Sequence, residues 1–229
     1  MTTNIDVVVP TLNAGPGLAR TIAALGGGDH SLALSITVCD GGSRDDTLAI
    51  ARQAGTAVLM SPPGRGRQLA TAAAAGSAPW LLFLHADTTL GTGWADAVRR
   101  FTADAANAEK AGYFRLRFDS LDPRARRVER LAAWRCRTFG LPYGDQGLLI
   151  ARAFYQRLGG FRPLPLMEDV AFARRIGRAN LVPLEADAVT SAQRYESDGW
   201  LLRPMRNLSC LALFSAGVPP SVIRRLYDR

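Results

Sequence analysis

Short apolar runs alternate with helical patterns along the first part of the chain, and this alternation leaves few folds open. Runs with the length and apolar content of buried strands occupy Ile5–Pro10, Leu34–Asp40, Thr56–Met60 and Trp80–His85. Helical patterns separate these runs at Gly15–Leu25, Arg44–Ala54 and Arg67–Gly76. Strands that alternate with helices pair in parallel through right-handed crossovers. The sequence therefore predicts an α/β fold with a mostly parallel central sheet flanked by helices.

The second part of the chain is less regular. Strand patterns are found at Gly112–Phe118, Leu148–Ala151 and Asn180–Leu184. Helical patterns are found at Asp122–Phe139, Ala153–Leu158, Glu168–Gly177 and Gly199–Phe214. No Ser- or Gly-rich linker divides the chain and the sequence contains no internal repeat. We therefore predict a single domain over residues 1–229, with one half at about 1–110 and the other at about 111–229.

Polar residues follow three of the predicted strands directly, in Pro10-Thr11-Leu12-Asn13, Asp40-Gly41-Gly42-Ser43 and His85-Ala86-Asp87. The carboxyl ends of parallel strands meet at one edge of a sheet, where ligands bind in open α/β folds. A carboxylate such as that of Asp87, together with diphosphate oxygens and water, can hold Mg²⁺ or Mn²⁺. The alternative interpretations are ordinary strand-to-helix turns and, for His85, a structural hydrogen bond in place of metal ligation.

Two further segments carry charged groups that suit chemistry on a phosphate. In Pro63-Gly64-Arg65-Gly66-Arg67-Gln68, arginines flanked by glycines precede a helix, an arrangement that favours phosphate contact. Glu168 and Asp169 open a helix, where one carboxylate could act as a general base. Adjacent residues point in different directions, so we expect only one of the two to be catalytic. The alternatives are an exposed basic loop and two carboxylates that stabilise the helix dipole.

The chain is strongly basic, with 28 Lys and Arg against 20 Asp and Glu and a net charge of +8. Much of the excess lies between Arg115 and Arg137. Nucleic acid, a phosphorylated substrate and an anionic membrane surface are all partners that this charge allows, and a solvated helix face is the plainer interpretation.

Cysteine spacing and hydropathy exclude several other classes of protein. The three cysteines are widely separated, which argues against a zinc site or a disulfide framework. The apolar runs are too short to span a bilayer and the first residues do not resemble a secretion signal. We expect a cytoplasmic protein, with possible peripheral contact at the inner membrane surface. The apolar residues of the last helix share one face, which fits core packing or membrane contact; they are Leu201, Leu202, Met205, Leu208 and Ala212.

These segments together resemble the family 2 inverting glycosyltransferases of the GT-A fold over nearly the whole chain. Val8–Asn13 resembles their opening strand motif, and Cys39–Ser43 resembles their nucleotide-binding segment. His85–Asp87 lies where the family carries its metal-binding Asp-x-Asp, with His85 in place of the first aspartate. Glu168-Asp169 resembles the catalytic-base motif. Within the family, segments that include Arg65–Gln68 and Tyr143–Gly147 resemble a bacterial subgroup named for association with radical-SAM and selenium-related domains.

The resemblance implies a role for each matching position. Asp169 is the implied catalytic base and Asp87 the implied ligand of Mn²⁺ or Mg²⁺. The positions implied to bind the nucleotide sugar are Pro10, Thr11, Asn13, Asp40, Gly41, Arg65, Ala86 and Asp87. The acceptor side is expected to include Asp145, Gln146, Glu168 and Arg194, the last from a segment similar to the Gln-x-x-Arg-Trp motif of processive members. The half at about 1–110 would bind the donor and the half at about 111–229 the acceptor.

The function that these residues predict is metal-dependent, inverting transfer of a sugar from a nucleoside diphosphate sugar to a hydroxyl acceptor, with no nucleic acid partner. A sugar-phosphate nucleotidyltransferase is one alternative, although its Gly-rich loop usually follows the first strand and not the third. A basic nucleic-acid-binding module is the other; it would explain the charge but not the carboxylates at successive strand ends.

Overall fold

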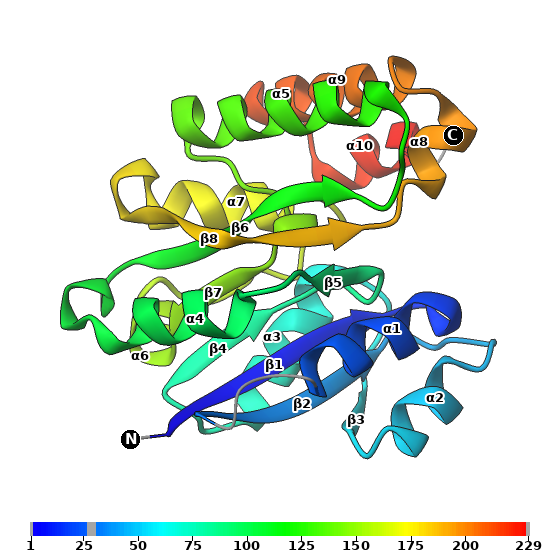
Figure 1. Ribbon diagram of the computed structural model, residues 1–229. Helices are drawn as coiled ribbons and strands as arrows, with labels where there is room; N and C mark the ends of the chain where they lie inside the picture. The colour runs from blue at the N-terminus through cyan, green and yellow to red at the C-terminus, as the bar shows by residue number, and fades with distance from the viewer. Residues whose placement is uncertain (1, 27–30, 228–229) are drawn as a thin grey trace.

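One sheet extends through both halves of the chain. The structure is a computed structural model that describes residues 2–26 and 31–227. Within these residues the sheet has eight strands in the order β3-β2-β1-β4-β7-β6-β8-β5 (Figure 1). The strands are β1 Thr3–Thr11, β2 Leu32–Asp40, β3 Ala57–Met60, β4 Trp80–Phe83, β5 Thr88–Leu90, β6 Ala111–Phe118, β7 Leu148–Ala151 and β8 Leu181–Thr190.

The sheet is mostly parallel, which confirms the predicted fold class. β1 pairs in parallel with β2 and β4, β2 with β3, and β6 with β8. The antiparallel pairs are β4 with β7, β6 with β7, and β5 with β8. The parallel strands of the first half all end at the same edge, so the polar segments after β1, β2 and β4 come together there.

The central strand β1 is buried on both faces, which explains its continuous run of valines. Val7 and Val9 pack on one face with α1 (Gly15–Gly26), α2 (Thr47–Gln53) and α4 (Trp94–Ala103). Val8 packs on the opposite face with α3 (Arg65–Ala75), α6 (Arg152–Arg157) and α7 (Glu168–Ile176). Two layers of helices therefore hold the sheet and fix the edge at which β1 ends.

The second half adds a further group of helices beside the ends of β6 and β8, at the top of Figure 1. These are α5 Pro123–Phe139, α8 Gln193–Asp198, α9 Leu202–Ser215 and α10 Pro220–Tyr227. Val128 and Ala132 of α5 pack against Phe118 of β6, while Cys210 of α9 and Ile223 of α10 join a cluster with α7. Short 3₁₀ turns occupy Ala105–Asn107, Gly144–Gln146 and Arg178–Asn180.

Most predicted elements are present, but several bounds and some elements differ. The helix predicted from Arg44 begins at Thr47, because Asn13 Oδ1 accepts a hydrogen bond from the Arg44 amide and holds the preceding residues outside the helix. The last predicted strand continues to Thr190, since charged residues alternate there with buried ones. The short strand β5 and the helices α4, α8 and α10 were not predicted. Among the described residues, no helix is long and apolar enough to cross a membrane.

Candidate active site

A cleft of about 570 Å³ lies at the edge where β1 and β4 end, and its far wall comes from the second half of the chain. Ten of the thirteen predicted site residues line it: Pro10, Thr11, Asn13, Arg65, Ala86, Asp87, Asp145, Glu168, Asp169 and Arg194. The three that do not line it are Asp40, Gly41 and Gln146. The structure thus brings together residues that are up to 184 positions apart, from Pro10 to Arg194.

Asp40 is completely buried and organises the edge of the sheet. Its carboxylate accepts hydrogen bonds from the Thr11 hydroxyl at 2.9 Å, the Gly42 amide at 2.8 Å and the amide and hydroxyl of Ser43 at 2.7 and 2.5 Å. Burial by itself raises the pKa of Asp40, but these hydrogen bonds outweigh it and hold the pKa below its ordinary value. This carboxylate therefore holds the ends of β1 and β2 together and does not line the cleft, although it was predicted to bind the nucleotide sugar.

Gly41 and Gln68 reinforce the same edge. The Gln68 side-chain amide donates to the carbonyl of Thr11 at 2.7 Å and to that of Cys39 at 2.8 Å. A Cβ atom on Gly41 would lie only 3.2 Å from Gln68 Nε2, so a larger residue there would push the Gln68 side chain away from these carbonyls. Gln68 was not predicted as a site residue, although it is a buried polar side chain in an otherwise alanine-rich helix.

The segment after β4 places Asp87 and His85 differently. Asp87 is exposed toward the cleft, and the Ala86 carbonyl before it accepts a hydrogen bond from the Thr21 hydroxyl at 2.9 Å. His85 lies against Gly144, where a Cβ atom would come within 2.3 Å of Nε2. Burial, together with the positive charges of Arg65 and Arg194, holds the pKa of His85 well below its ordinary value. His85 is therefore neutral near pH 7.

The adjacent carboxylates Glu168 and Asp169, predicted as an acceptor-side residue and as the catalytic base, both line the cleft. They follow Met167, whose φ of 65° is unusual for a residue other than glycine. Asp169 Oδ2 accepts a hydrogen bond from the Gly144 amide at 2.9 Å, and its Oδ1 accepts one from the Val170 amide at 2.7 Å. A carboxylate held in this way still has a lone pair on each oxygen for a substrate.

Glu168 is 2% exposed and forms an ion pair with Arg65, whose Nη1 lies 3.4 Å from Oε1. Burial raises the pKa of Glu168; the Arg65 charge opposes this and the neighbouring Asp169 adds to it. The ion pair joins the start of α3 to the start of α7 across the cleft. Arg65 is therefore positioned by a residue from the other half of the chain.

Asp145 is a second carboxylate of the cleft whose ionised form is disfavoured by burial. Its Oδ1 is buried and has no hydrogen-bond partner. Burial raises the pKa of Asp145 from 3.8 to about 6; Arg135 opposes the shift, while Asp169 and Asp87 add to it. The neighbouring residue Gln146 faces away from the cleft: its side chain donates to the Phe114 carbonyl at 3.1 Å and accepts from Arg135 at 3.0 Å.

The wall from the second half includes residues for which the sequence offered no signal. α9 contributes Arg203 and Asn207, and α10 contributes Arg224 and Tyr227. Arg203 is 6% exposed and pairs with Asp198 at 3.0 Å. The sequence alone does not distinguish a buried, paired arginine such as Arg203 from an arginine on the surface.

Asp87 is the side chain best placed to hold a divalent cation. Its carboxylate is a hard oxygen donor and is exposed to the cleft, which suits Mg²⁺ or Mn²⁺. Residues 2–26 and 31–227 contain no group of three or more His, Cys, Asp or Glu side chains arranged to hold a metal ion. Asp87 therefore fits a cation whose other ligands are substrate phosphates and water, as is usual for Mg²⁺.

A family comparison identifies the class of protein to which this cleft belongs. The profile of glycosyl transferase family 2 matches residues 6–139, which is more than half of the 229 residues. The chain belongs to glycosyl transferase family 2. It is accordingly a glycosyltransferase, and the matched region contains the ends of β1, β2 and β4 together with Arg65 and Asp87. No curated protein matches the chain significantly.

Solved structures show the same fold at low sequence identity. The mannosyltransferase of Pyrobaculum calidifontis, in complex with GDP-Man and Mn²⁺, has a TM-score of 0.68 and 18% identity over 99% of this chain and 69% of its own. TarS of S. aureus has a TM-score of 0.63 and 13% identity, and the match covers 98% of this chain but only 42% of TarS. Glucosyl-3-phosphoglycerate synthase of Mycobacterium tuberculosis, in complex with phosphoglyceric acid, has a TM-score of 0.57 and 19% identity over 82% of this chain and 70% of its own. The fold is therefore the GT-A fold.

Proposed function

We propose that this glycosyltransferase moves a sugar from a nucleoside diphosphate sugar to a hydroxyl acceptor, with inversion at the anomeric carbon. The observation that carries the proposal is the convergence of Asp87, Arg65 and Asp169 on one cleft from separate parts of the chain. A cation site, a phosphate-binding arginine and a positioned base are the groups that such a transfer requires.

The donor would lie along the edge formed by β1, β2 and β4. Thr11 and Asn13 line the cleft there, above the buried support made by Asp40 and Gln68. Arg65 would contact the diphosphate, and its ion pair with Glu168 would hold the guanidinium in place. The complex of the P. calidifontis mannosyltransferase with GDP-Man and Mn²⁺ supports a nucleotide sugar as donor and a divalent cation as its companion.

Asp87 would hold Mn²⁺ or Mg²⁺. A bound cation would neutralise the negative charge that develops on the departing diphosphate. Arg65 would add a second positive group on the same leaving group, and its guanidinium geometry suits two phosphate oxygens. The neutral state of His85 leaves the imidazole free to accept a hydrogen bond or to bind the cation.

Asp169 would take the proton of the acceptor hydroxyl as its oxygen attacks the anomeric carbon. The hydrogen bonds from the amides of Gly144 and Val170 orient the carboxylate. A single displacement with no covalent intermediate inverts the configuration. Asp145, Glu168 and Arg194 line the cleft and would serve the acceptor, and the complex of the M. tuberculosis synthase with phosphoglyceric acid supports an anionic acceptor as one candidate.

The finer assignment within the family follows from motifs. We place the chain in the bacterial subgroup associated with radical-SAM and selenium-related domains, on the likeness of Arg65–Gln68 and Tyr143–Gly147. Residues at about 1–110 would serve the donor and those at about 111–229 the acceptor. The peripheral membrane contact expected from the sequence concerns a different surface, on the outer side of α5 and α9.

Three variants test the proposal. Asp169→Asn should abolish turnover and leave donor binding nearly unchanged, because the base acts on the acceptor and not on the donor. Asp87→Ala should weaken donor binding in the presence of Mn²⁺, and its donor affinity should be the same with Mn²⁺ as with a chelator. Asp46→Asn is the matched control, since Asp46 is exposed and makes no capping hydrogen bond.

The measurements are donor affinity by calorimetry, with and without Mn²⁺, and release of nucleoside diphosphate during turnover. If Asp169→Asn lost donor binding to the same extent as turnover, Asp169 would be a donor ligand and not the base. Unchanged metal dependence in Asp87→Ala would refute the cation site. Release of pyrophosphate from a nucleoside triphosphate would replace the proposal with nucleotidyl transfer.

A further inference from the structure

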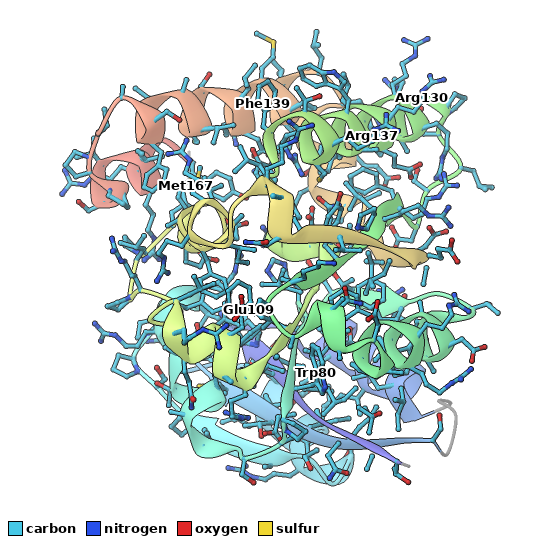
Figure 2. The ribbon with its side chains drawn as sticks, turned by 90° about the vertical axis from the view of Figure 1, so that its left-hand side faces the viewer. Trp80, Glu109, Arg130, Arg137, Phe139 and Met167 are labelled. Atoms are coloured by element: carbon cyan, nitrogen blue, oxygen red, sulfur yellow. The ribbon has the colours of Figure 1, made fainter. Side chains whose placement is uncertain are left out.

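The helices α5 and α9 present an unusual outer face. In both views they lie side by side on the outside of the molecule, with the sheet beneath them (Figures 1 and 2). Large apolar side chains that are 51 to 64% exposed project from them: Leu131, Trp134 and Phe139 on α5, and Leu202, Met205 and Leu208 on α9. We call these six residues the outer face. Large apolar patches are rare on soluble proteins and mark interaction sites, and these side chains are gathered on two neighbouring helices.

The aromatic part of the outer face is already assembled. The rings of Trp134 and Phe139 meet edge to face with centroids 5.2 Å apart. Neither ring is needed to fill the core beneath α5, where Ala125, Val128 and Ala132 make the contacts with β6 and its neighbours. Tryptophan and phenylalanine on the apolar side of a surface helix are typical of contact with the interfacial region of a membrane.

The exposed charged side chains of α5 are all arginines. Arg127, Arg130 and Arg137 are exposed on α5, and the structure gives them no ion pair with any described residue. The one acidic residue of α5, Glu129, is buried and pairs with Arg117 and Arg126. α9 and α10 contain no Asp or Glu. Figure 2 shows Arg130 and Phe139 at the same upper edge of the molecule.

We propose that the outer face docks on an anionic phospholipid surface, with the aromatic and aliphatic side chains in the interfacial layer and the arginines against lipid phosphates. A second copy of the chain is a poor occupant, because two such faces would place arginines together, and neither α5 nor α9 has an exposed acid to offset them. An anionic membrane supplies both the apolar layer and the negative charge that this face lacks. The proposal does not depend on the assigned reaction.

The inner sides of the same helices connect this surface to the cleft. Arg203 and Asn207 of α9 line the cleft, while Met205 and Leu208 of the same helix point outward. A docked molecule would therefore hold the acceptor wall of its cleft within the thickness of one helix from the lipid surface, about 10 Å.

The test uses the full chain and vesicles of phosphatidylcholine, alone or enriched in phosphatidylglycerol. Binding is followed by co-sedimentation and by tryptophan emission. Trp94 and Trp200 are buried and Trp80 is partly buried, so the more exposed Trp134 should dominate any change in emission. We expect binding to the anionic vesicles with a blue shift, weaker binding in salt, and no blue shift in Trp134→Phe.

Two paired variants locate the surface. Leu131→Ser with Met205→Ser removes apolar contacts, and Arg130→Glu with Arg137→Glu reverses charge; each pair should weaken binding by at least about ten-fold. Met60→Ser with Arg52→Glu makes similar changes at exposed positions on β3 and α2 and should bind as the unaltered chain does. Melting temperatures check that every variant is folded.

Three results would overturn the proposal. The first is no binding to anionic vesicles at low salt. The second is binding that the α5 and α9 variants leave unchanged, which would place the contact elsewhere. The third is a vesicle-free dimer, seen by sedimentation, that the Leu131→Ser and Met205→Ser pair dissociates; the outer face would then belong to a second copy of the chain.

Discussion

Replacement of Asp145 by asparagine should stabilise the fold, although Asp145 lines the cleft. Its Oδ1 is buried without a hydrogen-bond partner, and burial raises its pKa from 3.8 to about 6. The folded protein therefore holds an ionised Asp145 at a cost that the unfolded chain avoids. Asparagine has nearly the same shape and no charge to desolvate, so Asp145→Asn removes that cost.

The magnitude follows from the pKa. At 1.36 kcal/mol per pKa unit, the difference between 3.8 and about 6 corresponds to roughly 3 kcal/mol. Partial solvent access reduces this, and we expect a gain of about 1 to 3 kcal/mol in the free energy of unfolding. Below the unfolded pKa both states are protonated and the gain is absent. It grows as the pH rises from about 4 to 6, and is constant above the folded pKa.

Urea unfolding of metal-free protein, near pH 4 and near pH 7.5, measures the effect. Asp40→Asn is the control of opposite sign, because hydrogen bonds lower the pKa of Asp40 and its charge stabilises the fold at neutral pH. That variant should lose stability at both pH values, and the difference should shrink only at lower pH, as the pH falls through the folded pKa of Asp40, which lies below 3.8. A gain for Asp145→Asn that is equal at both pH values, or a loss at pH 7.5, would refute the electrostatic reasoning.

Two further substitutions probe the packing around the site and the opposite edge of the sheet. Gly144→Ala would bring a Cβ atom within 2.3 Å of His85 Nε2, so we expect weaker donor binding and a loss of about 1 to 3 kcal/mol in the free energy of unfolding. Gly26→Ala is the control, because a Cβ atom there meets open space and should change neither quantity. Calorimetry measures donor binding and urea unfolding measures stability for both variants. Asp6→Asn breaks a buried ion pair with Arg152 and should cost about 3 to 5 kcal/mol in urea unfolding, while the folded enzyme keeps its donor affinity.

The strand and helix patterns of the first half predicted that part of the fold well, because its signals are local. β1 is buried on both faces and reads as a continuous apolar run, and each glycine-rich turn ends an element. β8 was predicted too short for the opposite reason. Glu185 and Asp187 lie on its exposed side between buried Leu184, Ala186 and Ala188, so the strand lacks a continuous apolar run.

The sequence predicted which residues gather at the site better than it predicted what each side chain contacts there. Asp87 and Asp169 follow local motifs, and both line the cleft. Asp40 belongs to an equally clear motif, yet its carboxylate is buried and accepts hydrogen bonds from the hydroxyls of Thr11 and Ser43. The number of donors around a carboxylate is a property of the folded edge, and a sequence motif does not contain it.

The charge of the chain illustrates the same limit. Arg135 donates to the Leu141 carbonyl at 2.8 Å, Arg152 to the Ala78 carbonyl at 2.6 Å, and Arg175 to the Gly160 carbonyl at 2.6 Å. These guanidinium groups satisfy backbone acceptors within the fold, as Arg is suited to do with its several donors. A net charge of +8 counts them equally with the arginines on the outer side of α5. Net charge therefore indicates a nucleic acid or membrane partner only when the arginines that bind backbone carbonyls within the fold are left out of the count. Once they are left out, the exposed arginines of α5 still form a cationic surface.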